Sequence, residues 1–457
     1  MRLRNAMAGA LLPVLLTAGL AGCMPDIGTD PLPEAMEFDP SAAPPRVPEP
    51  IFIAQTPGTG VIDLALAGVE VPEDCSALDP MAIAQCEFNR YLETLPGFPT
   101  LTPAKAPSTA AVDLGTATLG DTVLVIDAAA GTAVPDVTVG YDETALALTI
   151  DPAKGWDVGK AYVLAVRGYA DGVRSEDGTE MVAGPIFALL RSTESLTCGA
   201  ATAEEVAPDC KFYVVLEADL GDDTAGTLLQ LDAIRQAMAA MKVFELAEAA
   251  GLPRAQTAVL WAFSTHPSPV IELDPTRGLA PVVAGSREIR MGFKGTIDPA
   301  TATPWGMWGN ATNTGTVFLL DLTALAVGDM LAGLPPFAVT LDGQEMVLTA
   351  DADLAAGHTF GILVTTAVTD DKELALAPSP LTVLLRSSGA LLTEDGKSTV
   401  SGVNDDQAAQ LEPARQELAL LLSDPQFSGL TGLTRENLAF VFSFDLPGAA
   451  PAPGGDR

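Results

Sequence analysis

A long-spaced internal repeat constrains the fold of this chain more than any other feature. Residues 231–236 (Leu-Asp-Ala-Ile-Arg-Gln) return as residues 411–416 (Leu-Glu-Pro-Ala-Arg-Gln), and each copy follows an apolar run that ends in Leu-Leu-Arg-Ser, at Ser192 and at Ser387. Self-similarity at such spacing indicates two copies of one structural unit. With 457 residues, the chain is long enough for two or three domains that each bury a core.

Short apolar runs separated by Gly, Pro and Asp turns surround each copy of the repeated stretch, which is typical of an antiparallel β-sandwich. The expected strands are residues 123–127, 146–150, 161–166, 186–190 and 258–263 in the first copy and residues 317–321, 346–350, 360–364, 381–385 and 439–444 in the second. We therefore expect a mainly β fold with helices: two tandem Ig-like β-sandwich units, each with an amphipathic helix after its sandwich.

The repeated stretch itself has a helical period, because apolar residues recur at i, i+3, i+7 and i+10 in both copies. The resulting stripes are Leu231, Ile234, Met238 and Met241, and Leu411, Ala414, Leu418 and Leu421. Asp232 with Arg235, and Glu412 with Arg415, can pair on the helix flank for a few tenths of a kcal/mol. The stripe predicts that this helix is buried against its own β unit or at the seam with the next unit, rather than forming a ligand groove.

The first residues predict export. Two arginines precede residues 6–18, which are mostly apolar and too short to span a membrane as a helix. They lead into Leu-Ala-Gly-Cys23, which resembles the lipobox of bacterial lipoproteins, where the cysteine thiol is the acyl acceptor. The alternative is an ordinary signal peptide followed by a chance cysteine.

This resemblance implies a signal peptide over residues 1–22 and lipidation of Cys23, so that membrane contact occurs through a lipid anchor. Met24, rather than Asp, follows the cysteine, which favours the outer membrane. Residues 23–50 are rich in proline and predict a lipidated, semi-rigid tether. The repeat then places the first Ig-like unit, with its N-terminal extension, over residues 51–265, the second over residues 266–446, and a flexible tail over residues 447–457.

The other four cysteines form two close pairs, Cys75 with Cys86 and Cys198 with Cys210. An even number in an exported chain favours two local disulfides, although four cysteines allow three connectivities and free thiols are an alternative. Each local bridge would stabilise the fold by about 2–3 kcal/mol. The two histidines, His266 and His358, lie far from these cysteines in the sequence, so we predict no metal site.

The net charge of −35 excludes a dense basic face and therefore nucleic acid as a partner. It also disfavours docking on an anionic membrane surface. The simplest interpretation is solubility of an exported protein. Acidic turns at residues 219–223, 370–371 and 404–406 could instead hold Ca²⁺, but those before the repeated helices are better placed to cap free N–H groups.

Catalytic motifs are missing from the sequence. An α/β-hydrolase serine needs a Gly-x-Ser-x-Gly turn, and the nearest stretch, residues 357–361, has Thr359 in place of serine at the start of an expected strand. Phosphate-binding loops and dinucleotide fingerprints are also absent. We therefore assign no catalytic residue and no cofactor. The aromatic cluster at residues 305–308 could stack on sugar rings, but packing at a sandwich edge is the favoured interpretation.

Several features together resemble a known family. A Phe-Asn…Leu…Gly-Phe-Pro stretch (Phe88, Asn89, Leu92, Gly97, Phe98 and Pro99) precedes the first Leu-Leu-Arg-Ser run, the repeated helix and an aromatic strand ending near Thr265. Residues 85–445 thereby resemble the N-terminal domain of bacterial virulence-factor lipases and related surface lipoproteins with bacterial Ig-like repeats. In the lipases this region precedes an α/β-hydrolase domain, for which this sequence shows no motif.

These observations favour an exported, lipid-anchored cell-envelope protein with a non-catalytic role in binding, scaffolding or adhesion. Its ligand would be a protein or a polysaccharide. The family resemblance supports an alternative, an accessory module of a lipase or another envelope enzyme. A further alternative is a hydrolase with an unrecognised site, which rests on analogy of fold alone.

Overall fold

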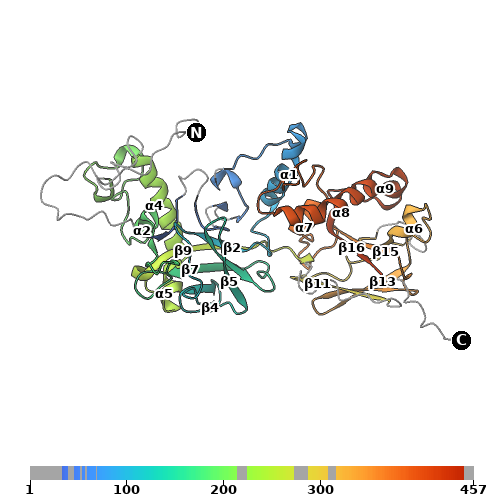
Figure 1. Cartoon of the computed structure of the whole chain (residues 1–457), viewed down its shortest axis with the longest axis horizontal. Coiled ribbons are helices and arrows are strands. Elements are labelled where there is room, and N and C mark those ends of the chain that lie inside the picture. Colours follow the sequence, from blue (N-terminus) through green and yellow to red (C-terminus); the bar gives the residue numbers. More distant parts are fainter. Residues whose placement is uncertain are drawn as a thin grey trace. The chain divides into compact units, whose positions relative to one another are not determined.

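The computed structural model describes residues 33–39, 46–51, 54–56, 59–67, 69–213, 224–271, 287–306 and 315–446 (Figure 1). The chain forms two compact units that interleave along the sequence. The first consists of Met1–Glu49, Ala104–Ile150 and Val163–Ala262, and the second of Pro50–Pro103, Asp151–Tyr162 and Phe263–Arg457. We use first unit and second unit for these two. The sequential boundary at residues 265–266 stays a prediction drawn from the repeat.

The protein is mainly β with helices, as predicted, and the first unit contains two main sheets. Their strand orders are β2-β6-β5 and β4-β3-β7-β9. A separate two-stranded sheet is formed by the short parallel strands β1 and β8. The strands are β1 (Ala35–Met36), β2 (Ala104–Pro107), β3 (Val123–Asp127), β4 (Thr132–Ala133), β5 (Val137–Asp142), β6 (Ala147–Pro152), β7 (Ala161–Arg167), β8 (Val182–Ala183) and β9 (Thr257–Ser264).

The second unit contains two antiparallel sheets with orders β10-β11-β14-β13 and β12-β15-β16. Their strands are β10 (Val270–Ile271), β11 (Glu288–Lys294), β12 (Val317–Asp321), β13 (Phe337–Asp342), β14 (Glu345–Ala350), β15 (Thr359–Thr365) and β16 (Leu438–Asp445). Alternate residues of both sheets point into one shared core, including Met291 and Leu348 from one sheet and Leu319 and Ile362 from the other. This core joins the two sheets into one body.

Helices occur in both units, and none of those in the described residues is long and apolar enough to cross a membrane. The α-helices are α1 (Pro80–Thr94), α2 (Pro185–Leu190), α4 (Thr224–Ala240), α5 (Val243–Ala249), α6 (Leu322–Ala326), α7 (Pro380–Leu385), α8 (Asp405–Ser423) and α9 (Pro425–Thr431). Short 3-10 helices form at Leu64–Ala67, Cys75–Ala77, Ala203–Glu205 and Arg254–Gln256.

The predicted strands at residues 186–190 and 381–385 are wrong, because both segments are helices, α2 and α7. Each helix begins with proline at its first position, where the missing N–H costs nothing and the fixed φ suits a helix. Ser379 caps α7, since its side chain accepts from the Thr382 amide. A short apolar run has no period that separates a buried helix from a strand. The other predicted strands coincide with β3, β6, β7, β9, β12, β14, β15 and β16.

The predicted helical stripe is confirmed in the second unit. Leu418 of α8 is buried against the outer face of the β12-β15-β16 sheet, and Leu411, Ala414 and Leu421 pack on the same cluster. Figure 1 shows α7, α8 and α9 on one side of β15 and β16, with β11 and β13 on the other side. The second unit therefore has three layers: helices, a sheet and a second sheet.

In the first unit the stripe is confirmed for three of its four positions. Leu231 and Met238 of α4 are buried, and Ile234 is half-buried. The prediction that Met241 belongs to the buried stripe is wrong, because α4 ends at Ala240 and the Met241 side chain is 38% exposed.

Candidate functional site

The repeated helix places a carboxylate inside the first unit. The Asp232 side chain is buried and accepts hydrogen bonds from Arg235 Nε (2.7 Å), Gln236 Nε2 (2.8 Å) and the Leu196 amide (2.8 Å). The Leu196 amide belongs to the loop after α2. Asp232 therefore ties this loop to α4.

The second unit repeats the arrangement with glutamate. Glu412 accepts from Arg415 (2.6 and 2.8 Å), Gln416 Nε2 (2.8 Å) and the Leu391 amide (2.9 Å), which lies in the loop after α7. Burial would by itself raise the pKa of Glu412, but these hydrogen bonds outweigh it and lower that pKa to about 2. We call the two arrangements the carboxylate clamps. The predicted ion pairs are confirmed, and the structure adds that Asp232, Glu412 and Arg415 are buried.

The arginine of each Leu-Leu-Arg-Ser run also bonds within its own unit. Arg191 donates to the carbonyl oxygens of Ala255 (3.0 Å) and Thr257 (3.1 Å), at the start of β9. Arg386 donates to the carbonyl oxygens of Glu436 (3.3 Å) and Leu438 (2.9 Å), at the start of β16. The residues that make the repeat visible in the sequence thus connect its helices, loops and returning strand.

Both predicted disulfides are present in their local pairing. Cys75 bonds Cys86, with the two Cα atoms 5.6 Å apart, and Cys198 bonds Cys210, with the two Cα atoms 5.9 Å apart. Such bridges are typical of proteins that mature in an oxidising compartment. The predicted lipidation site, Cys23, lies outside the described residues.

Two of the three acidic turns lie in the described chain, and their oxygens bind backbone amides. Asp370 accepts from the amides of Lys372 (2.9 Å) and Leu374 (2.8 Å). Asn404 caps α8 by accepting from the Gln407 amide (2.8 Å). Across the part of the chain that the structure describes, no group of three His, Cys, Asp or Glu side chains is arranged to hold a metal ion. The turn at residues 219–223 lies outside the described residues.

One pairing near the chance Gly-x-Thr-x-Gly stretch was missed by sequence reasoning. His358 Nδ1 lies 2.7 Å from Asp321 Oδ2, and Asp321 also caps α6 through the Ala324 amide (3.0 Å). The Thr359 hydroxyl donates to Asp445 (2.6 Å), so this hydroxyl is directed to a carboxylate rather than to the histidine. Thr359 begins β15, as the sequence predicted.

The aromatic stretch at residues 305–308 contributes to the core. Trp305 is 3% exposed and stacks on Phe318, with their ring centroids 5.6 Å apart. It belongs to the cluster between the β12-β15-β16 sheet and its helices. The favoured interpretation, core packing, therefore holds for Trp305, and residues 307–308 lie outside the described residues.

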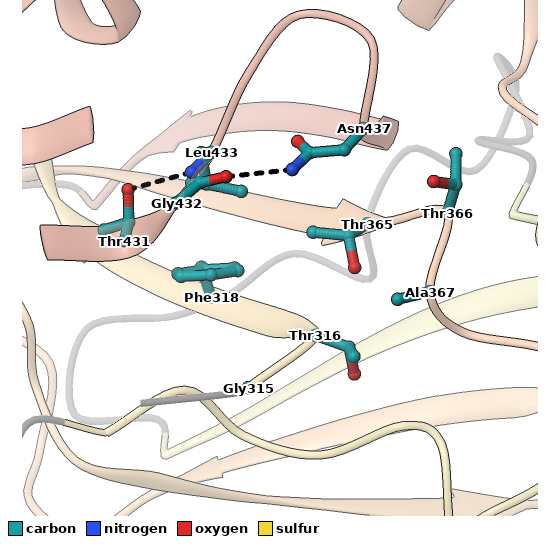
Figure 2. Close-up of a pocket in the computed structure, with 10 residues that line it drawn as sticks. All are labelled: Gly315, Thr316, Phe318, Thr365, Thr366, Ala367, Thr431, Gly432, Leu433 and Asn437. Atoms are coloured by element: carbon teal, nitrogen blue, oxygen red, sulfur yellow. Dashed lines mark hydrogen bonds between the residues drawn. The ribbon is translucent and has the colours of Figure 1, made fainter. Parts of the chain in front are cut away.

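A pocket of about 220 Å³ opens in the second unit at the ends of β12 and β15, beside the turn from α9 into β16 (Figure 2). Its lining consists of Gly315, Thr316, Phe318, Thr365, Thr366, Ala367, Thr431, Gly432, Leu433 and Asn437. Phe318 supplies an aromatic floor, whereas hydroxyl, amide and backbone groups supply the walls. We call this space the threonine pocket.

Hydrogen bonds hold one wall of the threonine pocket. The Leu433 amide donates to Thr431 Oγ1 (3.3 Å), and Asn437 Nδ2 donates to the Gly432 carbonyl oxygen (3.0 Å), as Figure 2 shows. Thr365 is 6% exposed, and its Oγ1 has no hydrogen-bond partner among the described residues. A buried hydroxyl without a partner costs about 1–3 kcal/mol, so a ligand that bonds it would recover that energy.

Sequence reasoning missed the threonine pocket because its residues come from three segments far apart in the chain. A signal was nevertheless present. Residues 251–254 (Gly-Leu-Pro-Arg) return as residues 432–435 (Gly-Leu-Thr-Arg), just before the returning strand in each copy. The second of these stretches supplies two lining residues of the pocket.

Comparisons with known proteins do not assign the chain to a family. No protein-family model matches the chain, and no curated protein matches it. Similar solved structures include the S-layer protein rSbsC(31-844), at 13% identity over 42% of this chain and 20% of that chain, with a TM-score of 0.17. The N-terminal part of the bacterial S-layer protein SbsC matches at 12% identity, over 42% of this chain and 35% of that one, with the same TM-score. The chain thus spans a minor part of these proteins, and so low a TM-score carries no argument.

Proposed function

We propose that this protein is an exported, lipid-anchored cell-envelope protein whose two Ig-like β-sandwich units serve a non-catalytic role in binding or scaffolding. The observation that carries the proposal is the use of the repeated residues. In both units the carboxylate clamp and the arginine of the Leu-Leu-Arg-Ser run bond to the protein's own backbone. The two units therefore share hydrogen bonds that stabilise the fold. Shared residues with a stabilising role are what we expect of a module displayed on the cell surface for binding or scaffolding.

The Ig-like arrangement is supported by the sheets. In the second unit one core joins the β11-β14-β13 strands to the β12-β15-β16 sheet. The first unit has corresponding orders, β2-β6-β5 and β3-β7-β9. Two sheets around a shared core, with short strands and tight turns, are the elements of a sandwich.

Export and anchoring are supported by the disulfides together with the first residues of the sequence. The bridges at Cys75–Cys86 and Cys198–Cys210 favour an oxidising compartment. Acyl chains on Cys23 would hold the protein on the membrane at about 0.8 kcal/mol per buried CH₂. The tether predicted over residues 23–50 is too long, because β1 pairs with β8 and the Met36 and Phe38 side chains are buried in the first unit. Only the residues between Cys23 and β1 could act as a spacer from the bilayer, and we place the anchor in the outer membrane.

Membrane fractionation of a Cys23→Ser variant tests this proposal. Without the thiol no acyl group can be attached, so the variant should move from the membrane pellet to the soluble fraction, or should accumulate with its signal segment uncut. A Met24→Ser variant keeps the thiol and should remain in the pellet. If Cys23→Ser partitions into membranes as the parent does, the lipid anchor is refuted.

An ester-hydrolysis assay tests the non-catalytic part. In the presence of purified protein lacking residues 1–23, short- and long-chain esters should be hydrolysed no faster than the background rate. The His358–Asp321 pair provides the sharpest control, because it is the described histidine–carboxylate pair that most resembles a catalytic dyad. Hydrolysis that exceeds background and disappears in a His358→Gln variant would replace the proposal with a hydrolase.

A further inference from the structure

The first unit contains an arginine that is bound by the protein itself. Arg167, at the end of β7, donates from Nη1 to Gln256 Oε1 (2.7 Å), from Nη2 to the Gly251 carbonyl oxygen (2.9 Å) and from Nε to the Asp121 carbonyl oxygen (3.3 Å). All three acceptors are neutral oxygens. Together they form a guanidinium site, because their positions match the planar fork of N–H donors.

Backbone hydrogen bonds identify the same positions in the second unit. The Arg167 amide donates to the Thr122 carbonyl oxygen (2.8 Å), just as the Thr365 amide donates to that of Thr316 (2.9 Å). Thr365, the last residue of β15, therefore occupies the position of Arg167. Asp121 precedes Thr122 as Gly315 precedes Thr316, so Gly315 occupies the position of Asp121.

The local bonding around these threonines confirms the correspondence. Thr122 Oγ1 donates to the Thr116 carbonyl oxygen at 2.6 Å, and Thr316 Oγ1 donates to the Thr301 carbonyl oxygen at 2.6 Å. The two threonines thus make the same bond just before their strands, although the bonded residues are 6 positions apart in the first unit and 15 apart in the second.

The remaining two acceptors correspond as well. The Gly168 amide donates to the Gln256 carbonyl oxygen (2.9 Å), and the Thr366 amide donates to that of Asn437 (2.8 Å). Asn437 therefore occupies the position of Gln256. Gly251 and Gly432 each follow a short helix, α5 or α9, with φ of +92° and +68°, and each precedes a buried leucine. Gly432 therefore occupies the position of Gly251.

The threonine pocket of the second unit thus corresponds to the guanidinium site of the first unit, but threonine stands where the first unit has the arginine. All four equivalents, Gly315, Thr365, Gly432 and Asn437, line the pocket. Threonine replaces the long Arg167 side chain, which leaves space and also leaves Thr365 Oγ1 without a partner among the described residues. Figure 2 shows Thr365, Gly432 and Asn437 among the residues that line the pocket, with a hydrogen bond between Gly432 and Asn437.

We propose that the threonine pocket binds a guanidinium group from outside, the side chain of an arginine on a partner protein. The proposal rests on the proposed binding role and names the chemistry of its ligand. The guanidinium would donate to the carbonyl oxygens of Gly315 and Gly432 and to Asn437 Oδ1, as Arg167 does to their equivalents. In the structure Asn437 Oδ1 accepts from the Thr434 amide (2.9 Å) and Asn437 Nδ2 donates to the Gly432 carbonyl oxygen (3.0 Å), so the guanidinium would use the second lone pair of each oxygen.

Size and charge are consistent with this ligand. The volume of about 220 Å³ is many times the roughly 10–15 Å³ that a cavity needs to hold one water, so a guanidinium and the methylenes next to it have room. The net charge of −35 raises the local concentration of cationic partners. An ammonium group would be a poorer ligand, because its compact head does not reach three acceptors arranged for a planar fork.

Calorimetric titration of the purified chain with Nα-acetyl-arginine amide tests the proposal, with Nα-acetyl-lysine amide as the matched probe. We expect one saturable site per chain for the arginine probe. The lysine probe should bind at least about tenfold more weakly, because it leaves an acceptor unpaired. Absence of saturable arginine binding, or equal affinity for both probes, would overturn the proposal.

Two variants locate the site. Thr365→Arg restores the residue of the first unit, should fold as the parent does, and should abolish binding because its own guanidinium fills the pocket. Arg167→Thr should empty the site of the first unit and raise the stoichiometry from one to two. If Thr365→Arg is unfolded by circular dichroism, Asn437→Leu replaces it, with at least about a tenfold loss expected.

Undiminished binding in a folded pocket variant would overturn the assignment to this pocket. A negative titration leaves the proposed function standing, because membrane fractionation and the ester assay report on that function independently.

Discussion

At the scale of single residues, the second unit keeps a charged pair inside the protein. Glu412 and Arg415 are both buried, and the carboxylate remains ionised because it accepts hydrogen bonds from Arg415, Gln416 and the Leu391 amide. Moving two charges out of water is costly, so such a pair adds little net stability. Loss of one partner is different, since the remaining charge stays buried without compensation.

We therefore predict that Glu412→Gln lowers the free energy of unfolding by about 3 kcal/mol. Glu417→Gln is the matched control, because Glu417 lies on the exposed face of the same helix and its change should cost less than about 0.5 kcal/mol. Urea unfolding measures both. Equal effects of the two substitutions would show that the clamp contributes nothing specific.

The lowered pKa of Glu412 also predicts a pH range over which the free energy of unfolding changes. Its pKa is lowered from 4.5 to about 2 in the folded protein, so the unfolded chain binds a proton first as the pH falls. The clamp's contribution is therefore present above pH 4.5 and is lost as the pH falls toward 2. In Glu412→Gln this part of the acid dependence should be absent.

His266 titrates in a different window. It is 1% exposed, its Nδ1 has no hydrogen-bond partner among the described residues, and burial lowers its pKa from 6.5 to about 4. Since the unfolded histidine takes up its proton near pH 6.5, stability should fall between pH 6.5 and 4 by about 3 kcal/mol.

A His266→Phe variant, compared with the parent by urea unfolding at several pH values, measures this. The variant should lose the slope between pH 6.5 and 4 and keep the slope below pH 4, to which Glu412 contributes. If the variant retains the full dependence above pH 4, His266 does not couple protonation to unfolding.

At the scale of elements, most strands could be predicted because their apolar runs lie between turn residues. The same rule failed for residues 186–190 and 381–385, where the apolar run has no alternation and the deciding information is the proline that begins each helix. The helical stripe was predictable because it depends on period alone. The buried position of the clamps was not, since it depends on loops that pack over the helices.

The threonine pocket was also beyond prediction from single segments. Gly315, Thr365 and Asn437 lie on separate strands and turns, and only the folded sheet brings them together. The local disulfides were predictable from spacing, because cysteines 11 and 12 residues apart can meet without help from the rest of the fold.

Helix α8 supports a prediction at this scale. Leu418 is 5% exposed in the cluster beneath the helix, whereas Leu420, two residues away, is 72% exposed. Leu418→Ala should lower the free energy of unfolding by about 2–5 kcal/mol, because it removes buried methyl groups and leaves a cavity. Leu420→Ala should change it by less than about 0.5 kcal/mol. Similar losses in urea unfolding would show that the stripe does not anchor the helix.

At the scale of the whole molecule, the order of the sequence and the order of the units differ. The second unit includes α1, from early in the chain, because Glu87 of α1 accepts hydrogen bonds from Ser387 (2.6 Å) and from the Ser388 amide (2.9 Å). These contacts join residues about 300 positions apart. Patterns within short windows carry no information about such pairings, so the repeat alone suggested two units in sequential order.

Net charge gives the last prediction, because it acts on the molecule as a whole. The 59 acidic side chains exceed the 24 basic ones, and the net charge of −35 destabilises the compact state by self-repulsion. Raising the salt concentration from 0.01 M to 1 M shortens the screening length from about 30 Å to about 3 Å. We expect Tm to rise by about 2–4 °C for each kcal/mol of repulsion removed.

Calorimetry in NaCl and in tetramethylammonium chloride of equal ionic strength measures this rise. Screening does not depend on the identity of the cation, so both salts should raise Tm alike. A much larger rise in CaCl₂ at matched ionic strength would show that acidic turns bind Ca²⁺, which screening alone does not explain. A Tm that falls with NaCl would contradict self-repulsion and would show that ion pairs between surface charges outweigh the excess of negative charge.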